Sequence, residues 1–84
     1  MRILLVEDDA ALAGAVCSYL TAKAFVVDVT SGLAQARAAL AAVQYAAVLL
    51  DLHLGDGDGL SLLPDVRALR QRPIVIGVTA RDQV

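Results

Sequence analysis

The chain alternates between short apolar runs and longer segments in which apolar residues recur every three or four positions. Four runs are almost entirely apolar, as expected of strands that are buried on both faces. They are "RILLV" (residues 2–6), "FVVDV" (25–29), "AAVLL" (46–50) and "IVIGVT" (74–79). The segments between them have helical spacing, which predicts a regular alternation of strand and helix.

The first helix is expected from Asp9 or Ala10 to about Lys23, with Asp9 as its N-cap. Ser31 is expected to cap the second helix. Pro64 should kink or shorten the third helix, because proline lacks an N–H donor. The apolar residues that mark the second and third helices are Leu33, Ala36, Leu40 and Val43, and then Leu60, Leu62, Leu63, Val66 and Leu69.

Strands that alternate with helices predict a parallel sheet with right-handed crossovers and helices on both faces. We therefore assign the chain to the α/β class, as an open doubly wound parallel sheet of the flavodoxin-like type. The common strand order 2-1-3-4 would make the first and third strands neighbours.

Length, composition and charge narrow the class of protein. Eighty-four residues suffice for one domain, which we assign to residues 1–84. The hydrophobic fraction of 58 % argues against disorder, and the net charge of −2 argues against direct DNA binding. No apolar stretch approaches the roughly 18 residues that cross a bilayer, so we expect no membrane contact. A single cysteine and the absence of a leader pattern favour the cytoplasm.

Acidic residues follow two of the predicted strands. Glu7, Asp8 and Asp9 follow the first strand and Asp51 follows the third, so the order 2-1-3-4 would bring them to one edge of the sheet. Two carboxylates about 4 Å apart repel by roughly 4 kcal/mol at an effective dielectric constant of 20. Either some acids are protonated or a hard cation such as Mg²⁺ lies among them. The alternative is that Glu7 to Asp9 only cap the following helix.

Thr79 ends the fourth predicted strand and would lie at the same edge of the sheet. Its hydroxyl could donate to an anion held by the metal. The competing interpretation is a local bond from the hydroxyl to the backbone, which is common at strand ends.

Three motifs together resemble the receiver domain of two-component response regulators. They are "LLVEDD" near the N-terminus, "VLLDLHLGDGDG" in the middle and "VTARD" near the end, in the order and at about the spacing of that family. The resemblance implies that Asp51 is the phosphoacceptor. It also implies that Glu7, Asp8, Asp51 and the backbone carbonyl of His53 hold Mg²⁺, and that Thr79 hydrogen-bonds the phosphoryl group and relays its presence.

The resemblance further implies a function. A sensor histidine kinase would transfer its phosphoryl group to Asp51, and the domain would act as a switch that catalyses its own phosphorylation and dephosphorylation rather than as an enzyme. Such receivers often precede a DNA-binding output domain. DNA would therefore be contacted only through an output domain that is absent from this chain, and the expected output is transcription.

The chain departs from the family pattern in three places. Gly55 stands where the family usually has proline four residues after the acceptor, which would loosen the loop. Pro73 and Thr79 are one residue further apart than usual. The family's last helix, strand and helix, with a lysine and an aromatic switch residue, have no counterpart before Val84.

Without that last strand, the fourth strand would have a bare edge, so we expect a homodimer or an exchange of elements through it. The alternative function is therefore an interaction or dimerisation module on a truncated receiver fold that is not phosphorylated.

Other classes of site fit the sequence less well. A phosphatase of the haloacid dehalogenase type has a second aspartate two residues after its nucleophile, where this chain has His53. The segment Asp56 to Gly59 lacks the further oxygen ligands of a calcium loop. The glycines after the third strand do not have the G-x-G-x-x-G spacing of a dinucleotide site.

Overall fold

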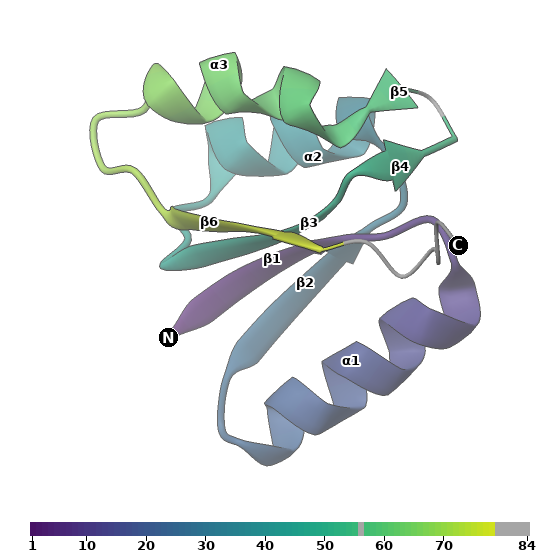
Figure 1. Ribbon diagram of the computed structural model, residues 1–84. Coiled ribbons are helices and arrows are strands. Elements are labelled where there is room, and N and C mark those ends of the chain that lie inside the picture. Colours follow the sequence, from purple (N-terminus) through teal and green to yellow (C-terminus); the bar gives the residue numbers. More distant parts are fainter. Residues whose placement is uncertain (56, 79–84) are drawn as a thin grey trace.

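A parallel sheet forms the middle layer of the molecule, with α1 on one face and α2 and α3 on the other (Figure 1). The computed structural model describes residues 1–55 and 57–78. The four strands of the sheet are β1 (Arg2–Val6), β2 (Val26–Thr30), β3 (Ala47–Asp51) and β6 (Ile74–Val78). The helices are α1 (Ala10–Ala22), α2 (Leu33–Ala42) and α3 (Leu63–Arg67), the last preceded by the 3₁₀ turn η1 (Gly59–Leu62).

The order of the strands is β2-β1-β3-β6, and all three pairings are parallel. Since β6 is the fourth long strand in the chain, this confirms the predicted order 2-1-3-4 and the doubly wound fold. The central strands β1 and β3 are in register with Val6 opposite Leu50. The carboxyl ends of β1 and β3 therefore meet at one edge of the sheet.

The main core lies between the sheet and the layer of α2 and α3. Strand side chains alternate between the two faces, and those pointing into this core from β1 and β3 are almost fully buried. The buried residues of this cluster include Leu4, Val6, Val48 and Leu50 from the strands, Leu33, Ala36 and Leu40 from α2, and Leu62 and Val66. The other face of the same strands packs toward α1 through Ile3 and Leu5, so the nearly continuous apolar runs are explained by burial on both sides.

Two predicted strands are shifted by one residue: β2 spans Val26–Thr30 and not 25–29, and β3 spans Ala47–Asp51 and not 46–50. The second strand begins at Val26 and not at Phe25, because the Phe25 N–H donates to Leu20 O at 3.2 Å and so belongs to the end of α1. Ala24, with φ of 72°, makes the turn between them. The third strand ends on Asp51 itself, since β3 spans Ala47–Asp51 and not 46–50.

Helix capping follows the sequence in one case and departs from it in another. Asp9 caps α1 as predicted, accepting from the Leu12 N–H at 3.1 Å. The prediction that Ser31 caps α2 is wrong: Gly32 is the N-cap and makes no side-chain bond. The reason is that Gln35 reaches back, and its Oε1 accepts both the N–H and the hydroxyl of Ser31, at 2.9 and 3.1 Å.

The third helix is short, as Pro64 predicted. Asp58 caps η1 by accepting from the Leu60 N–H at 2.9 Å, and Pro64 lies in the first turn of α3. A proline is tolerated there because the first N–H groups of a helix have no partner within it. Within the described ranges, no helix is long and apolar enough to span a bilayer.

Candidate functional site

Three carboxylates converge at the edge of the sheet where β1 and β3 end. Glu7 follows β1 directly, Asp8 is the next residue, and Asp51 ends β3. Each of the three offers one oxygen atom, and these oxygens all lie within 4.8 Å of one another. The structure therefore brings together the acids that the sequence placed at a common edge.

Two of these carboxylates are buried. Glu7 is 7 % and Asp51 5 % exposed, whereas Asp8 is exposed. Burial raises the pKa of Glu7, and the neighbouring Asp51 and Asp8 raise it further, while a hydrogen bond from the Asp9 N–H, at 3.1 Å, acts to lower it. The carboxylates of the cluster therefore repel one another, and a bound proton or cation would reduce this repulsion.

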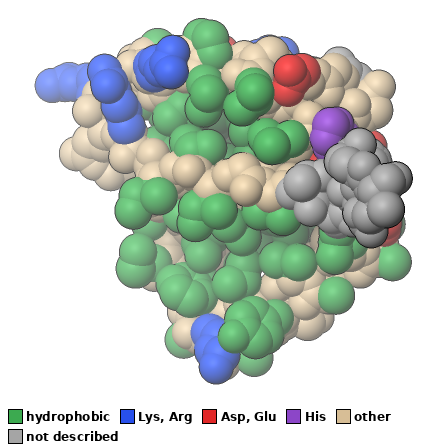
Figure 2. Space-filling model, in the orientation of Figure 1, with side chains coloured by type: hydrophobic (Ala, Val, Ile, Leu, Met, Phe, Trp, Pro, Cys, Tyr) green, Lys and Arg blue, Asp and Glu red, His purple; other side chains and the backbone are tan. Residues whose placement is uncertain are grey.

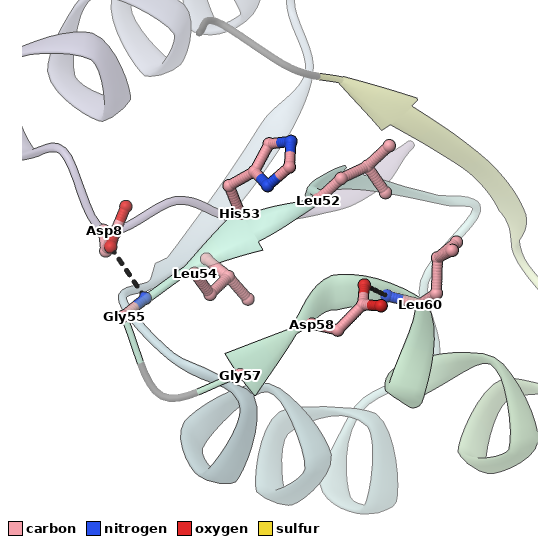
Figure 3. A pocket seen from close by; sticks show the side chains of 8 residues that line it. All are labelled: Asp8, Leu52, His53, Leu54, Gly55, Gly57, Asp58 and Leu60. Carbon is pink, nitrogen blue, oxygen red and sulfur yellow. Dashed lines mark hydrogen bonds between the residues drawn. The ribbon is translucent and has the colours of Figure 1, made fainter.

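The loop after β3 supplies N–H groups that orient two of the acids. The His53 N–H donates to Asp51 Oδ1 at 3.0 Å. The Gly55 N–H donates to Asp8 Oδ2 at 2.9 Å, a bond drawn in Figure 3. A proline at position 55 could not make the second bond. Glycine in place of the usual proline at position 55 therefore has a structural effect, because its N–H bonds the loop to Asp8 of the acidic cluster.

Gly59 contacts the backbone of Asp51 and was not singled out as a site residue from the sequence. A Cβ at this position would lie 2.2 Å from the Asp51 carbonyl oxygen and 3.1 Å from Leu52 Cα. The Gly59 N–H also donates to Leu52 O at 3.3 Å. Only a glycine fits here without displacement. In the sequence, Gly59 could have been recognised as the last of three alternating glycines that precede a helix.

A small hairpin borders the site, between β3 and η1. β4 (His53–Leu54) and β5 (Gly57–Asp58) pair antiparallel, and Gly57 has φ of 147°, a conformation that favours glycine. A cavity of about 580 Å³ lies beside the hairpin (Figure 3). Its lining residues are Asp8, Leu52, His53, Leu54, Gly55, Gly57, Asp58 and Leu60.

The donor set fits a hard divalent cation. Three carboxylates, two of them buried, provide the oxygen ligands that Mg²⁺ prefers, and the exposed Asp8 leaves one side open to water. The side chain of His53, in β4, is exposed. Thr79, the remaining predicted site residue, lies outside the described residues.

Comparison with known proteins connects this chain to one family. The family model described as "Response regulator receiver domain" matches residues 3–84. The swarming motility regulation protein RssB of Serratia marcescens is 42 % identical over 84 residues, which are 100 % of this chain and 38 % of RssB. The transcriptional regulatory protein QseB of Escherichia coli O157:H7 is 40 % identical over 82 residues, 98 % of this chain and 37 % of QseB. The chain thus spans well under half the length of these relatives.

Solved structures show the same fold. A response regulator receiver domain (CheY-like) from Methylobacillus flagellatus has a TM-score of 0.89 at 30 % identity, and the match covers 96 % of this chain and 70 % of that one. The MaeR response regulator bound to beryllium trifluoride has a TM-score of 0.85 at 34 % identity, covering 99 % of this chain and 70 % of MaeR.

Proposed function

Because this chain belongs to the response regulator receiver domain family, we propose that it accepts a phosphoryl group from a sensor histidine kinase onto Asp51 and acts as a signalling switch. One observation carries this proposal. Asp51 is a buried carboxylate at the end of β3, and it shares an oxygen cluster within 4.8 Å with Glu7 and Asp8. An apolar residue would pack better than a carboxylate at this buried position, so packing does not explain the presence of Asp51.

The proposed metal ligands are the carboxylates of Glu7, Asp8 and Asp51 together with the backbone carbonyl of His53. Bound Mg²⁺ would neutralise negative charge that develops on the phosphoryl oxygens. A carboxylate oxygen of Asp51 attacks phosphorus in line, so that the new O–P bond forms as the bond to the imidazole nitrogen of the donor breaks. The His53 N–H holds Asp51 Oδ1 and so fixes the orientation of the nucleophile.

The phosphorylated state differs from the free state mainly by charge. A phosphoryl group adds about two negative charges at neutral pH, and Thr79 is proposed to donate its hydroxyl to it. The response is a shift between two populations of the domain, and hydrolysis of the acyl phosphate by water resets it. The domain is thus proposed to act as a switch that catalyses its own phosphorylation and dephosphorylation.

The output is proposed to be transcription, in the cytoplasm. QseB is named as a transcriptional regulatory protein, and this chain corresponds to 37 % of its length. DNA would be bound by a separate output domain and not by this domain, whose net charge of −2 does not favour contact with phosphates.

The test is the intact mass of the chain after incubation with acetyl phosphate and Mg²⁺. One added phosphoryl group is expected, and it should disappear when EDTA replaces Mg²⁺. Asp51→Asn is the matched control, because asparagine keeps the shape and accepts the His53 N–H but is a poor nucleophile. An adduct of equal yield on Asp51→Asn, or none on the native chain at any Mg²⁺ concentration, would contradict the proposal.

A second candidate function is favoured by a different observation, the apolar side chains of β6. Ile74 is 69 %, Ile76 48 % and Val78 43 % exposed. We propose that the chain also serves as an interaction module, in which a homodimer or an exchange of elements covers this strand. Sedimentation velocity over a range of protein concentrations tests it: a sedimentation coefficient that rises with concentration is expected, and a monomer throughout would exclude it.

A further inference from the structure

The three acids of the cluster differ in how their side chains are held in place. Glu7 and Asp51 are buried, so packing restricts their rotamers, whereas Asp8 is exposed. Figure 2 shows acidic side chains at the surface beside the histidine, where water and ions can reach them. An exposed carboxylate keeps several rotamers unless a hydrogen bond selects one. Asp8 is therefore the proposed metal ligand whose position depends most on such a bond.

The bond that holds Asp8 comes from a distant part of the chain. Glu7 and Asp51 each accept a backbone N–H from a donor two residues further along. Asp8 accepts the Gly55 N–H at 2.9 Å from a donor 47 positions away, as Figure 3 shows. Of these three bonds, the one to Asp8 thus forms only when the loop after β3 lies against the end of β1.

This bond prepares Asp8 for a cation in two ways. A carboxylate has about four lone-pair sites, so one N–H on Oδ2 leaves room for a metal ion. An N–H that donates to a carboxylate also favours its charged form, which reduces the cost of keeping three carboxylates with oxygens within 4.8 Å of one another. The ligand is therefore oriented before the cation binds.

The backbone at position 55 does not itself require a glycine. Its φ lies outside the left-handed region, and a Cβ would meet Asp8 Oδ2 at 3.4 Å, an ordinary contact. Leu54 belongs to β4 and is extended, which is the conformation favoured before a proline. Alanine therefore keeps the N–H at this position, and proline removes it while suiting the chain that precedes it.

We propose that the Gly55 N–H is a positioning group for the cation, and that by fixing Asp8 it raises the affinity of the acidic cluster for Mg²⁺ about tenfold. This inference rests on the proposed function, in which Asp8 is a metal ligand. Hydrogen bonds to the ligands of a metal orient them, and losing one typically weakens metal binding about 10- to 100-fold. The lower end of that range applies because Asp8 is exposed and water can replace the N–H.

Isothermal titration calorimetry with Mg²⁺ alone tests the proposal on the unphosphorylated chain. Gly55→Pro should raise the Kd for Mg²⁺ about tenfold. Gly55→Ala is the matched control, because it adds a side chain and retains the N–H, and its Kd should stay within about twofold of the native value. Circular dichroism shows whether each variant keeps the native secondary structure.

A second variant isolates the N–H if Gly55→Pro does not fold. A synthetic chain with glycolic acid at position 55 has a backbone ester after Leu54, so that oxygen replaces the N–H and the side chains stay the same. This chain should show the same increase of about tenfold in the Kd for Mg²⁺.

The Mg²⁺ dependence of phosphorylation separates positioning from a general loss of structure. With acetyl phosphate as donor, Gly55→Pro should need about ten times more Mg²⁺ for the half-maximal rate. Its rate at saturating Mg²⁺ should stay within about twofold of the native rate, because Asp51 keeps the N–H bond from His53. A variant with damaged structure would instead have a lower rate at every Mg²⁺ concentration.

The outcomes that overturn this inference differ from those that overturn the proposed function. If neither the proline nor the ester chain raises the Kd for Mg²⁺, or if Gly55→Ala raises it equally, the Gly55 N–H has no positioning role. The same conclusion follows if the native chain binds no Mg²⁺. A native chain that binds Mg²⁺ and gains no phosphoryl group loses the proposed function, and the calorimetry alone then decides the role of Gly55.

Discussion

Gly59 lies against the backbone of Asp51, so close that a Cβ would be 2.2 Å from the Asp51 carbonyl oxygen. The proposed phosphoacceptor is thus held from two directions. The His53 N–H fixes its carboxylate at 3.0 Å, and Gly59 packs against its main chain. Any residue larger than glycine at position 59 must displace the loop that begins at Asp51.

Gly59→Ala is expected to destabilise the domain by about 1–3 kcal/mol, the usual range for overpacking, and to lower phosphorylation by acetyl phosphate. Gly14→Ala is the matched control, because a Cβ there meets nothing within 4 Å and the residue lies in α1. That change should raise stability by about 0.5–1 kcal/mol through helix propensity. Urea denaturation followed by circular dichroism measures both. Similar effects of the two variants would show that Gly59 does not support Asp51.

Mg²⁺ should stabilise the native chain by relieving the repulsion among the three acids. A ligand at 100 times its Kd adds about 2.7 kcal/mol to the free energy of unfolding. Because burial raises the pKa of Glu7, its charge works against folding at neutral pH when no cation is present. Glu7→Gln should therefore raise stability in EDTA and lose most of the Mg²⁺ effect.

Asp9→Asn is the control for that experiment. Asn retains the N-cap of α1, and Asp9 is not part of the three-carboxylate cluster. Thermal unfolding in EDTA and in Mg²⁺ gives the comparison. Asp9→Asn should respond to Mg²⁺ as the native chain does. The idea fails if Glu7→Gln responds in the same way.

Tyr45 should make the stability of the fold sensitive to alkaline pH. It is 5 % exposed and its hydroxyl donates to Asp28 Oδ2 at 2.6 Å. Burial, and then the bond to Asp28, raise the pKa of Tyr45 from 10.0 to about 12. The protonated Tyr45 hydroxyl therefore contributes fully to the free energy of unfolding below pH 10, and this contribution is lost as the pH rises through about 12. Tyr45→Phe should lack this alkaline transition and be less stable by about 1 kcal/mol at neutral pH; an unchanged profile would refute the assignment.

Asp28 should act at the opposite end of the pH scale. The guanidinium of Arg2, which donates to it at 2.9 and 3.2 Å, and the Tyr45 hydroxyl hold the pKa of Asp28 below 3.8. The carboxylate therefore stabilises the fold above pH 3.8, and this contribution is lost as the pH falls through the lowered pKa. Asp28→Asn should flatten the acid limb of stability between pH 5 and pH 2. Denaturant titrations across that range are the check, with Asp65→Asn, in the exposed pair with Arg37, as the comparison.

Much of the fold was predictable because each element has a local signature. The four apolar runs predicted four strands, and their alternation with helical spacing predicted a parallel sheet. The placement of Glu7 and Asp51 after neighbouring strands was enough to predict that they meet. These inferences depend only on period, burial on both faces and the geometry of parallel sheets.

The tertiary structure decided what contacts between distant residues determine. Ser31 looked like a helix cap, but Gln35 takes its hydroxyl and its N–H. Tyr45 and Asp28 stand 17 residues apart in the sequence, yet the Tyr45 hydroxyl donates to the Asp28 carboxylate. No local pattern reports such a bond, because its energy depends on where two segments come together.

The same division holds at the site. The amino-acid sequence alone was enough to identify the carboxylates and the strands that they follow. The burial of Glu7 and Asp51, and the contacts of Gly55 with Asp8 and of Gly59 with Asp51, could be known only from the folded chain. Charge and side-chain type are properties of a residue, whereas burial, close approach and a raised pKa depend on its neighbours in space.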